Sequence, residues 1–181
     1  MDGEIIFTQE RFDEMKHRCA SIAHDFYEWC NRNRKVYDMN DEESDPEDWA
    51  VSDERLEQLF EDLSKAMNVN PTCQRFRDND VYEGRYTEDG NVVLLPYCIN
   101  YAPERDIVKT ICHELFHAFQ YCAICYPDNY PFLTKVLVDK WRYEFDPNNY
   151  ENGDRDSRKY RGQEIEKSAS LFASEISSKK L

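Results

Sequence analysis

The sequence predicts an α+β fold: a mostly helical domain with a small antiparallel sheet packed beside one of its helices. Three observations support this prediction. Apolar residues recur at helical spacing in several long segments, a shorter β-rich stretch contains an Asp-Gly turn, and 181 residues are enough for one domain. Because 40% of the residues are hydrophobic and 14% are aromatic, the chain can build a core. We therefore expect a single domain over residues 1–181.

The amino-terminal part of the chain predicts two helices separated by an acidic linker. In residues 9–34 apolar side chains fall three or four positions apart, which is typical of a helix with one buried face. Residues 38–50 are nearly all acidic or helix-breaking, which indicates an exposed linker. Ser52 is in place to cap a second helix. The predicted division is an amino-terminal helix (1–37), the linker and a core (51–181).

The sequence between residues 73 and 97 is typical of strands. Residues 81–87 and 91–95 flank Glu88-Asp89-Gly90, whose Asp-Gly pair predicts a hairpin. Residues 91–95 are apolar on both faces, so we expect that strand to be covered on both sides. Further helices are expected over residues 104–121, 132–145 and 162–178.

Charge and cysteine content limit the classes of partner. With 23 basic and 37 acidic residues the net charge is −14, which disfavours nucleic acid and anionic membranes as partners. No apolar run approaches the roughly 20 residues that a membrane-spanning helix needs. Seven cysteines, with no visible export signal, predict reduced thiols in a cytoplasmic protein. Cys122 and Cys125 form an isolated CxxC, which we interpret as two half-buried thiols near a helix end.

The predicted helix 104–121 contains His113-Glu114-Leu115-Phe116-His117, an HExxH motif. Histidines four positions apart on a helix share one face and can bind one Zn²⁺, and Glu114 can then act as general base on a water. With only four histidines in the chain, the motif would occur by chance in about one such sequence in a hundred. The other two, His17 and His24, are expected on the exposed side of the first helix.

A catalytic zinc site needs a third protein ligand. No histidine follows His117, so this ligand is a downstream carboxylate unless His17 or His24 folds back. The best choice is Glu166, because it lies above a stripe of small residues that would let two helices approach closely. Glu164 is the first substitute, followed by Asp139 and Glu144.

Residues 90–120, together with Glu166-x-x-Ala169-x-x-Phe172-Ala173, resemble the gluzincin metallopeptidases of the ImmA/IrrE type. That family shows HELGH followed by E-x-x-A-N-x-F-A. The resemblance covers roughly the carboxyl-terminal half of the chain and leaves the first helix and the linker unexplained. Phe116 replaces the glycine before the second histidine, and Ser170 replaces the asparagine.

The resemblance implies a zincin-like fold and a zinc-dependent peptidase. By position, His113, His117 and Glu166 would be the zinc ligands and Glu114 the general base. Members of the family often cleave regulatory proteins, so the resemblance also implies a protein or peptide substrate.

Two further features of a peptidase site can be sought in the sequence. Tyr160, Arg161 and Tyr97 are candidate donors to the oxyanion that forms when a peptide carbonyl is attacked. The strand 91–95 could form the rim of the cleft and bind an extended peptide by edge pairing, if one of its edges is free.

Other functions remain open at this point. The main alternative is a non-catalytic binding or scaffold protein that keeps the same fold without metal. A nucleic-acid-associated protease of the SprT kind ranks low, because that family uses a third histidine and basic elements. An inhibitor whose acidic linker mimics nucleic acid is the third alternative.

Overall fold

The computed structural model describes residues 6–34, 50–75, 84–87, 89–94, 99–151 and 157–178. These residues are mostly helical and include a small mixed sheet, so the predicted α+β class is confirmed. The helices are α1 (Gln9–Asn33), α2 (Asp53–Met67), α4 (Glu104–Cys125), the 3-10 turn η2 (Pro127–Asn129), α5 (Lys135–Phe145), α6 (Ser157–Tyr160) and α7 (Glu164–Ser178). The strands are β1 (Thr72–Arg75), β2 (Gly84–Tyr86) and β3 (Asn91–Leu94).

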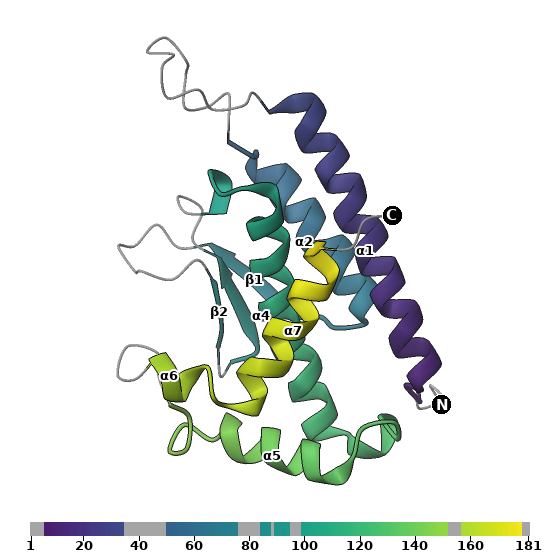
Figure 1. Ribbon diagram of the computed structural model, residues 1–181, viewed down its shortest axis with the longest axis vertical. Helices are drawn as coiled ribbons and strands as arrows, with labels where there is room; N and C mark the ends of the chain where they lie inside the picture. The colour runs from purple at the N-terminus through teal and green to yellow at the C-terminus, as the bar shows by residue number, and fades with distance from the viewer. Residues whose placement is uncertain are drawn as a thin grey trace.

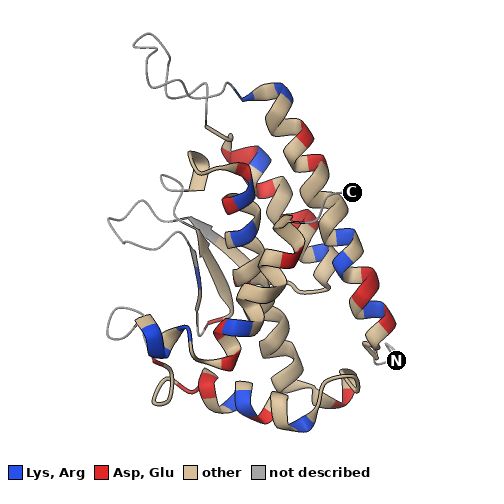
Figure 2. Cartoon of the chain, viewed as in Figure 1, with Lys and Arg blue, Asp and Glu red and all other residues tan. Residues whose placement is uncertain are grey.

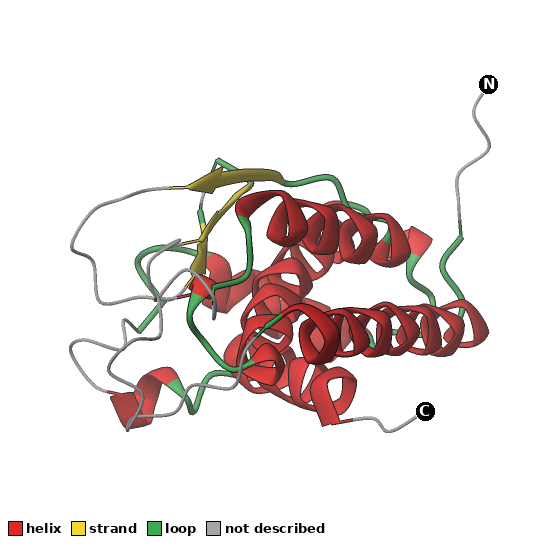
Figure 3. Ribbon diagram, turned by 90° about the horizontal axis from the view of Figure 1, so that it is seen from above, coloured by secondary structure: helices red, strands yellow, loops and turns green. Residues whose placement is uncertain are grey.

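Helix α4 occupies the centre of the molecule. Helix α7 crosses it, α1 and α2 lie on one side and the sheet lies on the other (Figure 1). Seen from above, the strands line one edge of the helical part (Figure 3). No helix in the described parts of the chain combines the length and apolarity needed to cross a bilayer.

The first two helices begin where the sequence predicts. Thr8 accepts a hydrogen bond from the backbone N–H of Arg11, and Ser52 accepts one from that of Arg55, each at 3.3 Å. These side-chain oxygens satisfy amide groups that a helix start leaves unpaired. Residues 38–49 of the predicted acidic linker lie outside the described residues.

The sheet differs from the predicted antiparallel one. Its strand order is β1-β3-β2, with β3 antiparallel to β2 but parallel to β1. The hairpin makes β2 run opposite to β3, and β1 pairs with the other edge of β3 in the same direction as β3. The strand 91–95, expected as a possible cleft rim, is therefore the central strand, and β2 is an edge strand.

The predicted hairpin is present between β2 and β3. Gly90 has a φ of +78°, a backbone conformation that side-chain-bearing residues rarely adopt. The N–H of Gly90 donates to the carbonyl of Thr87 at 2.9 Å, and the N–H of Thr87 donates to that of Asn91 at 2.8 Å. Val92 and Leu94 on one face and Val93 on the other are all buried, so the strand is covered on both sides as predicted.

Helices α4 and α7 share a close interface. Ala169 and Ala173 of α7 are fully buried, and each has only a methyl group as its side chain, so α4 can approach α7 closely. Phe116 stacks on Phe172 with ring centroids 4.7 Å apart. The aromatic residue that replaces a glycine in the motif therefore fills the space between the two helices instead of disrupting it.

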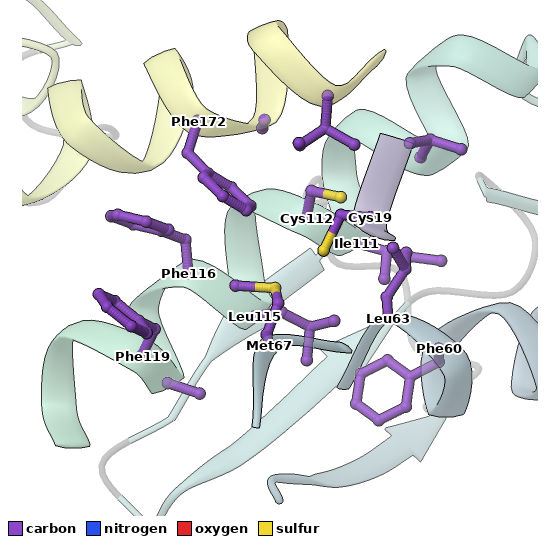
Figure 4. Close-up of a cluster of buried hydrophobic side chains, with 14 of the residues drawn as sticks. Cys19, Phe60, Leu63, Met67, Ile111, Cys112, Leu115, Phe116, Phe119 and Phe172 are labelled. Carbon is purple, nitrogen blue, oxygen red and sulfur yellow. The ribbon is translucent and has the colours of Figure 1, made fainter. Parts of the chain in front are cut away.

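The buried side chains of four helices form one core. Cys19 of α1, Leu63 of α2, Leu115 of α4 and Phe172 of α7 all contribute to it (Figure 4). The amino-terminal helix thus shares the core that supports the HExxH helix, although the family resemblance did not account for it.

Several helix boundaries differ from the predicted ones. Helix α4 continues through the CxxC to Cys125, where Cys122 is half-buried and Cys125 is exposed. Helix α5 begins three residues later than predicted, because Thr134 caps it and accepts a hydrogen bond from the N–H of Leu137. The short helix α6, before α7, was not predicted from the sequence.

Enlarging Ala169 should destabilise the protein. An Ala169→Leu substitution forces extra methylenes between α4 and α7, and overpacking of this kind costs about 1–3 kcal/mol. Urea denaturation of the metal-free protein would measure the loss. Lys167→Leu adds the same side chain at an exposed position of α7 and should change the free energy of unfolding by less than about 0.5 kcal/mol. Equal effects of the two substitutions would contradict the close helix contact.

Candidate metal centre

Three of the predicted site residues meet between α4 and α7. The Nε2 atoms of His113 and His117 lie 3.1 Å apart. Glu166 Oε2 lies 3.2 Å from His113 Nε2, and Glu166 Oε1 lies 3.5 Å from His117 Nε2. Their ligand atoms lie close enough together to hold one metal ion. Among the described residues, no other group of histidine, cysteine or acidic side chains does so.

The spacing of these atoms suits the binding of one metal ion. Metal–nitrogen and metal–oxygen bonds of about 2.0–2.1 Å place neighbouring ligand atoms about 3.3 Å apart on a tetrahedron. The two histidine nitrogens are 3.1 Å apart, and each has one of the two Glu166 oxygens at 3.2 or 3.5 Å. Two nitrogens and one carboxylate also form a donor set that suits Zn²⁺ and leaves a fourth position open.

Gln120 holds the second histidine. Its Oε1 lies 2.8 Å from His117 Nδ1, so the ring donates from Nδ1 and turns Nε2 toward the other two side chains. Gln120 is fully buried, and its Nε2 donates to the carbonyl of Ile165 at 3.0 Å and to Ser168 Oγ at 2.9 Å. One side chain of α4 therefore orients a histidine and also ties α4 to α7.

Ser170 lies beside Nδ1 of His113, as Gln120 lies beside Nδ1 of His117. Its Oγ lies 3.4 Å from His113 Nδ1, a longer separation than the one at His117. The Ser170 hydroxyl therefore faces the ring of His113. His113 is also the more exposed of the two histidines.

Glu166 is a buried carboxylate with several partners. Only 2% of its surface is exposed. Burial alone would raise the pKa of Glu166, but hydrogen bonds from His113, His117 and Tyr160 outweigh it and lower that pKa well below its ordinary value. The carboxylate is thus held in the charged form that a metal requires.

Glu114 lies next to this group and points toward the sheet. It is 7% exposed, and burial raises its pKa. The two histidines and a hydrogen bond from the backbone of Tyr86 partly offset the effect of burial. Glu114 therefore lies between the ligand group and the edge strand β2, with a proton affinity above that of an exposed glutamate.

The other carboxylates considered as third ligand have different roles. Glu144 is buried, and its Oε2 accepts a hydrogen bond from the backbone N–H of Ile165 at 2.9 Å, so it caps the start of α7. Glu164 pairs with Lys140 at 3.6 Å. Asp139 accepts a hydrogen bond from Arg142 at 2.7 Å.

The remaining predicted residues are spread over the molecule. His17 is exposed and His24 half-buried on α1, away from the metal-ligand group that the described residues form. Tyr160 reaches Glu166, whereas Arg161 donates from Nε to the carbonyl of Ser157 in its own segment. Tyr97 lies outside the described residues.

Two residues at the site were not found from the sequence. Gln120 follows His117 by three positions, a helical spacing that could have suggested a contact. Tyr150 donates from its hydroxyl to Glu166 Oε1 at 2.9 Å from a polar loop, where no periodicity would have indicated it.

Comparison with protein families, with curated proteins and with solved structures finds no match to this chain.

Replacing Gln120 should weaken metal binding. Gln120→Leu removes the acceptor at His117 Nδ1, and loss of such a partner typically costs about 10–100-fold in metal affinity. Gln120→Glu keeps an acceptor and should recover much of the loss. Competition with a chromophoric chelator would measure both. Equal zinc affinity of wild type and Gln120→Leu would contradict the orienting role.

The zinc affinity should also fall as the pH falls. Burial alone would lower the pKa of His117, but Glu166, Glu114 and Gln120 raise it above its ordinary value. His117 in the metal-free protein is protonated below this raised pKa, and zinc must displace that proton. Chelator competition should therefore give weaker binding at about pH 6 than at about pH 8. An affinity that stays constant over this range would contradict the assignment of His117 as a ligand.

Proposed function

We propose that this chain is a zinc-dependent metallopeptidase of the gluzincin type with a zincin-like core. The observation that carries this proposal is the convergence of His113, His117 and Glu166, close enough together to hold one metal ion, with Glu114 buried beside them. This combination supplies three ligands, an open position and a base, which are the parts that metal-assisted hydrolysis needs. The resemblance to ImmA/IrrE peptidases supports the same function.

In this proposal His113, His117 and Glu166 hold the ion. Zn²⁺ in that position supplies a Lewis acid, which lowers the pKa of a water and polarises the carbonyl of the substrate. The chain's own residues keep the donor set ready: Gln120 fixes the tautomer of His117, and the buried carboxylate of Glu166 stays ionised.

Glu114 is the proposed general base. Its carboxylate accepts a proton from the attacking water and gives it to the amine that leaves when the C–N bond of the peptide breaks. The raised pKa of Glu114 makes its carboxylate a stronger base toward the water, and the leaving amine, which is far more basic than a carboxylate, can still take the proton from it. Tyr160 is the proposed hydroxyl donor to the developing oxyanion, a role in which its O–H turns from Glu166 to the substrate.

The proposed substrate is an extended segment of a protein or peptide. Strand β2 is an edge strand of the described sheet, and the backbone of its Tyr86 contacts Glu114. A peptide pairing with this edge would pass close to the base. This strand therefore replaces the central strand β3 as the proposed rim of the cleft. As the resemblance implies, a regulatory protein is the kind of substrate to test first.

Metal analysis of the purified wild type should find about one zinc per chain. His113→Ala and Glu166→Ala should each lose most of it, because two remaining ligands bind weakly. Glu114→Gln should retain the zinc and lose hydrolysis of an unfolded protein substrate. Glu61→Gln, at an exposed glutamate of α2, is the matched control and should change neither property.

The outcomes separate the alternatives. Full zinc retention by Glu166→Ala would contradict the choice of third ligand. A wild type without stoichiometric zinc would favour the non-catalytic scaffold protein, as would a Glu114→Gln variant as active as wild type.

A further inference from the structure

Tyr150 contacts the metal-ligand group from outside the helices that form it. It lies in the loop after α5, and its hydroxyl donates to Glu166 Oε1 at 2.9 Å. The same Oε1 lies 3.5 Å from His117 Nε2, whereas Oε2 lies 3.2 Å from His113 Nε2. The tyrosine thus engages the carboxylate oxygen on the His117 side and leaves Oε2 next to His113.

The backbone next to Tyr150 is fixed by a buried glutamine. Gln163 Oε1 accepts a hydrogen bond from the N–H of Glu151, and Gln163 Nε2 donates to the carbonyl of the same residue, both at 3.0 Å. Gln163 is 7% exposed and also donates to the carbonyl of Tyr160 at 3.3 Å. Gln163 therefore holds the segment of Tyr150 and the segment of Tyr160 against the start of α7.

The loop is also held at its other end. The N–H of Tyr150 donates to the carbonyl of Asp146, the residue that ends α5, at 3.0 Å. The rings of Tyr150 and Tyr160 meet edge to face, with centroids 6.1 Å apart. Ring packing and backbone contacts thus leave the Tyr150 hydroxyl little freedom to turn away from Glu166.

We propose that Tyr150 is a positioning residue of the metal centre: its hydroxyl, held in place through Gln163, fixes the rotation of the Glu166 carboxylate so that Oε2 faces the ion. This inference rests on the proposed zinc site. A carboxylate whose second oxygen is tied down loses less rotational freedom when it binds a metal, so its affinity is higher.

The test compares zinc affinities by chelator competition. Tyr150→Phe keeps the ring and removes only the hydroxyl, and should weaken zinc binding about 10–100-fold. The absorption spectrum of the Co²⁺-loaded variant should also differ from wild type, because the carboxylate oxygen moves in the ligand shell. Tyr143→Phe, at an exposed tyrosine of α5, is the matched control and should leave affinity and spectrum unchanged.

Two double substitutions test whether Tyr150 acts on zinc affinity through Glu166, and Gln163 through Tyr150. In a Glu166→Ala background, Tyr150→Phe should change the remaining zinc affinity by less than about two-fold, since its partner is gone. Gln163→Ala should weaken zinc binding alone but add little to Tyr150→Phe, because both act through one hydroxyl. Additive losses in either pair would overturn the proposed route.

The remaining outcomes are distinct. Unchanged zinc affinity of Tyr150→Phe with a reduced kcat and an unchanged KM would make Tyr150 a donor to the reacting carbonyl and would overturn the positioning role alone. A phenolate-to-metal charge-transfer band in the Cu²⁺-loaded wild type, absent in Tyr150→Phe, would make Tyr150 a ligand and would also overturn it. A wild type that binds no zinc would overturn both this inference and the proposed function.

Discussion

Helices α4 and α7 approach closely because Ala169 and Ala173 place only methyl groups toward the neighbouring helix. This closeness lets a carboxylate from α7 reach two imidazoles on α4, since a glutamate side chain spans only a few ångströms. The same approach lets Gln120 bond across to Ile165 and Ser168. The stacked rings of Phe116 and Phe172 fill the remaining space. The three ligand-type side chains therefore meet only because the small and aromatic residues around them let α4 and α7 pack closely.

Burial of Glu166 between these helices has an electrostatic cost. A carboxylate removed from water is unfavourable unless charged or hydrogen-bonding partners surround it. Here the histidines and the hydroxyls of Tyr150 and Tyr160 act as those partners. The buried group thus stays charged, and the residues that stabilise it are those that face the proposed ion or adjoin it. Metal binding and local stability are coupled at this site for that reason.

Among the described residues, acidic and basic side chains are mixed over the helices. Acidic and basic side chains are interspersed along α1 and α2, and basic residues also lie on α6 and α7 (Figure 2). Lys16 pairs with Glu175 across α1 and α7, and Arg34 reaches Glu104 of α4. Pairs that remain partly open to solvent, as these do, contribute little to stability. The fold is therefore held mainly by its core, and the charge says little about the reaction at the proposed site.

The sequence by itself determined the features that local patterns record. Helical periodicity located the main helices, Asp89-Gly90 located the hairpin, and the spacing of His113 and His117 placed two imidazoles on one face. The absence of a later histidine required a carboxylate as third ligand of such a site, and the stripe of small residues favoured Glu166.

Only the tertiary structure decided the features that depend on contacts between distant segments. It made Glu144, one of the lower-ranked candidates for third ligand, a cap of helix α7. It inserted β3 between β1 and β2, because strand pairing depends on where edges meet rather than on apolar pattern. It also brought Tyr150 to Glu166 from an irregular loop. Periodicity records which face of one element is buried, but the partner of that face is chosen by the packing of the whole chain.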